Sequence, residues 1–166
     1  MSKSTVAALL TRPESVLQDI ERLCELAGVR QALDPSRSTI LKDNISWHFP
    51  LPGANTTPWQ LEGAILALEH AGYRDLSCVQ NETVVTDAFK GEDLNHYRPV
   101  FEKHGVRVLY NFEPKDMSLA AQYPLGCSVP ILRPACRLIL NAIGYRCGSV
   151  EHPSCHGTRA LHDSGA

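Results

Sequence analysis

The feature that most constrains the fold of this chain is a regular alternation of short apolar runs with helical patterns before residue 113. Strand-like runs occupy residues 5–10, 38–41, 76–79 and 106–110, and helix signals follow each of the first three. Strands that alternate with helices in this way form a parallel sheet with right-handed crossover connections. The sequence therefore predicts an incomplete, Rossmann-like α/β fold, with helices on the faces of a mostly parallel sheet and an irregular C-terminal tail.

The helices are predicted from their ends as well as from their periodicity. The segment TPWQ at residues 57–60 combines a capping box with proline at the first helical position, and Gly72 is suited to end that helix. The segment TRPE at residues 11–14 gives a similar start for the first helix. Pro99 interrupts a helical pattern over residues 93–104, so we expect it in the first turn of a short helix.

The sequence changes character near Met117. Residues 1–117 hold 12 Lys and Arg against 16 Asp and Glu, whereas residues 118–166 hold 4 against 2. Four of the six cysteines also fall in the second segment, while Cys24 and Cys78 lie at apolar positions and are expected to be buried. We therefore expect an α/β domain over residues 1–117 and a tail of uncertain structure over residues 118–166. Within the tail, Pro134–Ile143 is compatible with one short helix.

Charge and hydropathy bear on the class of partner. The formal net charge is −2 and the sequence pI is about 6.4, so no global field attracts the protein to nucleic acid or to anionic lipid. No apolar run is long enough to span a bilayer, and the hydrophobic stretch near the start is too short for a secretory signal. These features predict a cytoplasmic protein with reduced thiols that binds neither nucleic acid nor membrane.

Polar residues gather where predicted strands end and helices begin, which is where open parallel sheets bind ligands. A long loop, residues 45–57, connects the second strand with the next helix, and loops of this length are enriched in function. A cation, amides and helix N–H groups in this place predict a site for a small anion such as phosphate or carboxylate. The candidate ligand-binding residues are Lys42, Asn44, Asn55, Thr56, Thr57 and Glu82. The alternative is structural: the threonine caps the helix, the asparagines make turns and the lysine is solvated.

The same residues carry a family resemblance. The segments ILKDNISW at residues 40–47, PGANTTP at residues 52–58 and NETVVT at residues 81–86 resemble the domain of unknown function 362 family, over about residues 5–113. The resemblance implies an α/β fold and, in many relatives, a longer chain with an iron–sulfur ferredoxin module. Two departures stand out: Asp43 replaces the proline that usually follows the family's lysine, and the family's downstream segment has no counterpart after Met117.

Other patterns leave further interpretations open. The tail residues Cys147, His152, Cys155 and His156 suggest an iron–sulfur or zinc site of a redox-associated protein, although no Cys-x-x-Cys pair is present. An acidic stretch with Asp87, Glu92 and Asp93 suggests a loop for a divalent cation, with a solvated face as the alternative. The abrupt change near Met117 also fits a truncated, divergent or frame-shifted member of the family, or a remnant without function. No pattern identifies a catalytic residue, so whether the protein is an enzyme stays open.

Overall fold

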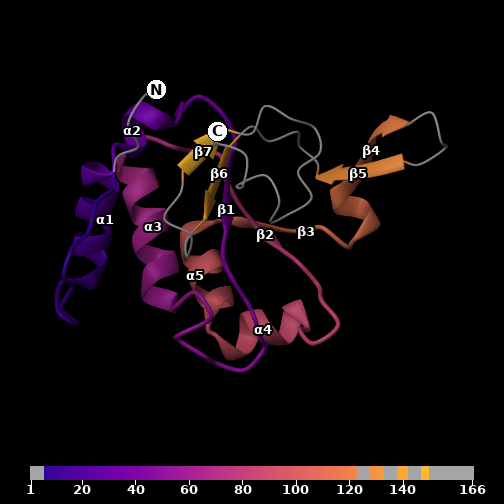
Figure 1. Ribbon diagram of the computed structural model, residues 1–166, viewed down its shortest axis with the longest axis horizontal. Helices are drawn as coiled ribbons and strands as arrows, with labels where there is room; N and C mark the ends of the chain where they lie inside the picture. Colours follow the sequence, from indigo (N-terminus) through magenta and orange to yellow (C-terminus); the bar gives the residue numbers. More distant parts are fainter. Residues whose placement is uncertain (1–5, 123–127, 133–137, 142–146, 150–166) are drawn as a thin grey trace.

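A computed structural model describes residues 6–122, 128–132, 138–141 and 147–149 of the chain (Figure 1). The elements, in chain order, are α1 (Val16–Leu26), α2 (Val29–Ala32), β1 (Thr39–Lys42), α3 (Pro58–His70), β2 (Leu76–Gln80), α4 (Ala88–Leu94), α5 (Tyr97–His104), β3 (Arg107–Tyr110), a 3-10 turn (Pro114–Asp116), β4 (Met117–Gln122), β5 (Ser128–Leu132), β6 (Leu138–Asn141) and β7 (Cys147–Ser149). Helices and parallel strands alternate through the first part of the chain, so the predicted α/β fold is confirmed.

The main sheet has the strand order β3-β2-β1-β6-β7. Strands β1, β2 and β3 are parallel, with Leu41 opposite Cys78 and Cys78 opposite Val108. Strand β6 is parallel to β1 on its other side, and β7 is antiparallel to β6. Strands β4 and β5 form a separate antiparallel pair, which Figure 1 shows apart from helices α1 to α5. Because β1, β2 and β3 run in one direction, their carboxyl ends meet at one edge of the sheet.

Helix α3 is the central helix of the core, and the sequence locates it correctly. Thr57 caps it in a full capping box with Gln60, and Gly72 follows its end with φ 95°, a left-handed conformation that favours glycine. Leu61, Ile65 and Leu68 have no exposed surface; they pack in one cluster with strand and α5 residues. Helix α1 packs on the outer side of α3 (Figure 1).

The prediction of a first strand over residues 5–10 is wrong. Residues 6–10 form no strand, and the side chains of Val6 and Leu10 are 89% and 97% exposed. A strand needs a neighbour as well as an apolar run, and residues 6–10 pair with none of the strands of the sheet. The capping box predicted at residues 11–14 also does not form: α1 begins at Val16, and the carboxylate of Asp19 accepts from the hydroxyl of Ser15 at 2.7 Å.

Two other segments differ from the sequence-based expectation. The helix proposed for Pro134–Ile143 is wrong, because Leu138–Asn141 is strand β6 beside β1; short apolar runs do not distinguish a strand from a helix. The acidic stretch is not a loop: residues 88–94 form α4, and Asp87 caps it by accepting from the backbone N–H of Lys90 at 3.1 Å. The interrupted helix is confirmed as α5, with Pro99 in its first turn.

Candidate functional site

The carboxyl edge of β1, β2 and β3 carries a row of polar side chains. Gln80 and Tyr110 end β2 and β3 as register partners, and Asp43 directly follows β1. The Oδ2 atom of Asp43 accepts a hydrogen bond from Nε2 of Gln80 at 2.8 Å. The Oε2 atom of Glu92, from α4, accepts from the hydroxyl of Tyr110 at 3.1 Å. Two carboxyl groups from distant parts of the sequence are therefore anchored on the same edge of the sheet.

Both carboxyl groups are enclosed. Asp43 is 0% exposed and Glu92 is 1% exposed. Within the part of the chain that the structure describes, Oδ1 of Asp43 and Oε1 of Glu92 have no hydrogen-bond partner. Most buried polar atoms in proteins are hydrogen-bonded, and an orphaned one costs about 1–3 kcal/mol. Each carboxyl group therefore has one satisfied oxygen and one oxygen whose accepting capacity is unused.

Burial changes the acidity of these groups. Desolvation raises the pKa of Asp43 to about 6, although the charge of Lys42 and the hydrogen bond from Gln80 act in the opposite direction. Desolvation likewise raises the pKa of Glu92 to about 7, opposed by the Tyr110 hydroxyl and by the nearby charge of Arg98. At neutral pH one buried carboxyl group is mostly ionised and the other is divided between its two protonation states. Strongly shifted carboxyl groups of this kind are frequent at functional sites.

Two further titratable side chains lie near this row. Burial raises the pKa of the Cys78 thiol well above its usual value, and the charge of Asp43 adds to the effect. Burial also raises the pKa of Tyr97, whose hydroxyl donates to the backbone carbonyl of Thr56. Both groups are therefore neutral at physiological pH, and Cys78 is buried as the sequence predicts, whereas Cys24 is only half-buried.

Asn55, predicted as a ligand residue, is the structural centre of the loop at residues 45–57. Its Oδ1 accepts from the backbone N–H groups of Ser46 at 2.9 Å and Trp47 at 3.4 Å. Its Nδ2 donates to the carbonyl oxygens of Trp47 and Phe49, both at 2.9 Å, and to Oδ1 of Asn95 at 3.0 Å. The side chain is 2% exposed. These contacts hold the loop against α4.

Asn44, Thr56 and Thr57 are also engaged within the protein. The backbone N–H of Asn44 donates to Oγ1 of Thr56 at 2.9 Å, and the N–H of Thr56 donates back to the carbonyl of Asn44 at 2.9 Å. The side-chain amide of Asn44 donates to the carbonyl of Ala54 at 2.6 Å. Thr57 caps α3. The structure brings these predicted residues together with Asn55 and gives each of them a structural contact.

Lys42 and Glu82 differ from the other candidates. Lys42 is half-buried at the end of β1, and its ammonium donates to the backbone carbonyl of Asp43. Among the described residues it forms no ion pair within 4.0 Å. Glu82 is exposed beside the turn in which Thr83 and Thr86 pair, without a hydrogen bond or ion pair in the described part. Lys42 is therefore close to the buried row through Asp43, whereas Glu82 is directed to solvent.

Asp43, Gln80, Glu92 and Tyr110 are the site residues that sequence reasoning did not bring together. Three of them lie at or directly after the end of a strand, which is a usable signal at the carboxyl edge of a parallel sheet. Glu92 carries no such signal, because it reaches the row only through the packing of α4.

The sequence also suggests two metal sites, one in the acidic stretch and one in the tail. No group of three or more His, Cys, Asp or Glu side chains is placed to hold a metal ion in the described ranges. Asp93 pairs instead with Arg98, Oδ1 to Nε at 2.6 Å. Of the tail candidates, Cys147 begins β7, while His152, Cys155 and His156 lie outside the described residues. The iron–sulfur or zinc interpretation therefore stays a prediction.

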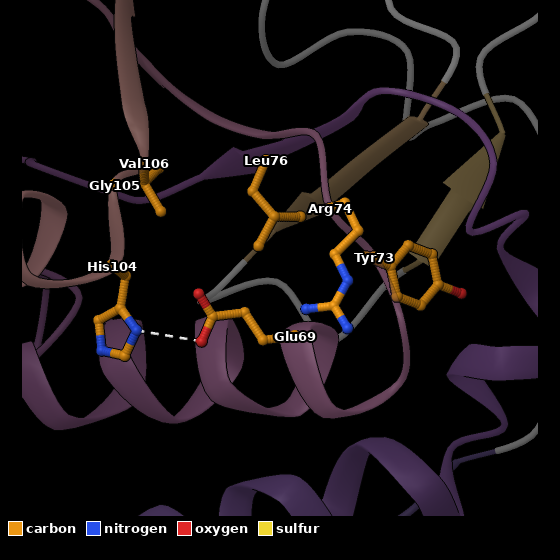
Figure 2. A pocket seen from close by; sticks show the side chains of 7 residues that line it. All are labelled: Glu69, Tyr73, Arg74, Leu76, His104, Gly105 and Val106. Carbon is orange, nitrogen blue, oxygen red and sulfur yellow. Dashed lines mark hydrogen bonds and ion pairs between the residues drawn. The ribbon is translucent and has the colours of Figure 1, made fainter.

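A small cavity lies at the opposite edge of the sheet, where β2 and β3 begin (Figure 2). It measures about 140 Å³ and is lined by Glu69, Tyr73, Arg74, Leu76, His104, Gly105 and Val106. Nδ1 of His104 lies 3.1 Å from Oε2 of Glu69, and its Nε2 lies 3.4 Å from Oε1 of Glu62. The imidazole thus bridges α5 to α3, and these contacts explain its position without a ligand.

Gly91 provides a test of how α4 holds the loop. A Cβ at this position would lie 2.7 Å from Cγ2 and 3.0 Å from Cδ1 of Ile45. We expect Gly91→Ala to lower the free energy of unfolding by about 1–2 kcal/mol, since overpacking outweighs the gain in helix propensity. Urea denaturation measures the effect. In the Ile45→Ala background the same change should be neutral or stabilising; an equal loss in both backgrounds would contradict the proposed contact.

Within the described residues, no helix is both long and apolar enough to cross a bilayer. No family model, curated protein or solved structure matches this chain.

Proposed function

We propose that this chain binds a small anionic ligand at the carboxyl edge of its parallel sheet. The observation that carries the proposal is the position of Lys42, a half-buried cation at the end of β1 that forms no ion pair among the described residues. Partial burial removes water from the ammonium, so a phosphate or carboxylate group at this position gains a charge-assisted hydrogen bond. Lys42 ends β1, and the carboxyl ends of strands are where ligands of open α/β sheets bind.

The proposal includes divergent membership of the domain of unknown function 362 family. What supports it is the strand, long loop and helix over residues 39–70, the unit on which the sequence resemblance depends. Within that unit, hydrogen bonds of Asn44, Asn55 and Thr56 fix the backbone of the loop at the carboxyl edge of the sheet. Lys42 then remains as the candidate side chain for direct contact with the anion.

Binding of inorganic phosphate, propyl phosphate and butyrate tests this function. The wild-type protein should bind at least one of these anions, seen as a rise in melting temperature and by calorimetric titration. Lys42→Gln should weaken that binding by about tenfold or more, the loss expected for one charge-assisted hydrogen bond. Lys103→Gln, at an exposed lysine near the end of α5 and the opposite edge of the sheet, is the control and should bind like wild type. Failure of all three anions, or equal binding by the Lys42 variant, would reject the function.

A further inference from the structure

The unpartnered oxygens of Asp43 and Glu92 indicate which chemical groups the ligand has in addition to its phosphate or carboxylate. Each carboxyl group is anchored through one oxygen, to Gln80 at 2.8 Å and to Tyr110 at 3.1 Å. The other oxygen of each has under 1 Å² of exposed surface and no hydrogen-bond partner in the described part of the chain. In the ionised form of each group this oxygen accepts hydrogen bonds and has none to donate, so its complement is a donor.

Two surface side chains lie beside the Glu92–Tyr110 pair. Arg98 is 44% exposed; its guanidinium lies 3.7 Å from Oε2 of Glu92 and is held mainly by Asp93 at 2.6 Å. Phe89 is also 44% exposed, and its ring centroid lies 4.8 Å from that of Tyr110. Exposed side chains change rotamer readily, within nanoseconds. Rotation of these two side chains therefore changes the surroundings of the Glu92–Tyr110 pair without unfolding of the sheet.

We propose that Asp43 and Glu92 accept hydrogen bonds from hydroxyl or ammonium groups of the anionic ligand that Lys42 binds. The inference rests on the proposed function and narrows the ligand to a small phosphorylated or carboxylated compound with donor groups. Hydrogen bonds to a carboxylate in a site shielded from water are stronger than those between neutral groups. They also satisfy the two oxygens whose burial is otherwise uncompensated.

Matched probes test the inference by calorimetric titration. Two pairs of probes differ by one ammonium group: propyl phosphate with 3-aminopropyl phosphate, and butyrate with 4-aminobutyrate. Glycerol 3-phosphate is the corresponding phosphate probe with hydroxyl groups as donors. In at least one series the probe with donors should bind wild type about tenfold or more tightly than its partner without them. Asp43→Asn and Glu92→Gln should each reduce that advantage, because an amide N–H₂ at the open position repels an ammonium. Glu102→Gln, at an exposed carboxylate of α5, should leave it unchanged.

A second measurement does not depend on the variants folding. With ¹³C-labelled wild-type protein, the carboxyl carbon signals of Asp43 and Glu92 should shift on addition of 3-aminopropyl phosphate and not on addition of propyl phosphate. If probes with and without donors bind equally and no such shift is seen, the inference about Asp43 and Glu92 is wrong, but the proposed binding of an anion by Lys42 is not contradicted. Binding of Mg²⁺ alone that Asp43→Asn abolishes would overturn it in favour of a cation. If no anionic probe binds, the proposed function fails and the inference fails with it.

Discussion

Raising the pH from about 5 to about 8 is expected to lower the free energy of unfolding by roughly 4 kcal/mol, through Asp43 and Glu92 alone. Burial raises their pKa values to about 6 and about 7, from ordinary values of 3.8 and 4.5. In this range the unfolded chain has already released most of both protons, whereas the folded protein releases them only as the pH rises through about 6 and about 7. The stabilising effect of the protonated groups is complete below their ordinary pKa values and is lost as the pH rises through 6 and 7.

Carboxyl groups with the opposite shift do not cancel this trend. Hydrogen bonds from Ser36 lower the pKa of Asp34, and the hydrogen bond from Lys103 lowers that of Glu62. Groups of this kind stabilise the fold above their ordinary pKa and lose that effect only as the pH falls through the lowered value. Their contribution therefore changes below about pH 5, outside the range in which the two buried carboxyl groups titrate.

Urea denaturation at several pH values measures this dependence. Asp43→Asn and Glu92→Gln should each flatten the slope, and the double variant should remove most of it, because an amide does not ionise. Glu102→Gln, with its exposed side chain on α5, should retain the wild-type slope. A wild-type stability that stays constant or increases between about pH 5 and pH 8 would show that the two groups are not protonated in the folded protein.

What the sequence predicts well depends on local signals. Helix α3 is recognisable because its capping box, its proline and its terminal glycine all lie within one segment. Strands β1, β2 and β3 are recognisable because each is a short apolar run between polar turns. Helix α4 is missed because its seven residues, AFKGEDL, are too few to establish a helical period. The failures at residues 5–10 and 138–141 both concern strand pairing, which depends on residues far away in the sequence.

For the candidate site, too, the sequence reveals local signals but not contacts between residues that are distant in the chain. From the sequence, polar residues including Lys42 are expected at the carboxyl edge of the sheet, and the structure has Lys42 there, at the end of β1. The sequence does not reveal that Asp43 meets Gln80 across 37 positions, or that Glu92 meets Tyr110 across 18. Nor does it show whether an asparagine beside a turn faces a ligand or the backbone. For Asn55 the structure shows the backbone contacts, and these contacts make a strong prediction.

Replacing Asn55 with alanine is expected to lower the free energy of unfolding by about 3 kcal/mol or more. The substitution removes five hydrogen bonds and leaves the N–H of Ser46 and the carbonyls of Trp47 and Phe49 without this partner. Each orphaned group costs about 1–3 kcal/mol where water cannot replace the lost bond. Water compensates in part, because the side chains of Trp47 and Phe49 are nearly half exposed.

Urea denaturation gives the stability, and Trp47 in the same loop makes tryptophan fluorescence a local probe. Asn81→Ala is the matched control: this half-buried asparagine accepts one hydrogen bond, from Asn111, so the loss should be about 1 kcal/mol. Asn55→Asp separates the two halves of the amide, because it keeps the acceptor for Ser46 and loses the donors to Phe49 and Asn95. If Asn55→Ala and Asn81→Ala lower the free energy of unfolding by the same small amount, the hydrogen bonds of Asn55 do not hold the loop. The Asn55 amide is then a candidate for direct contact with the ligand, as the sequence analysis predicts.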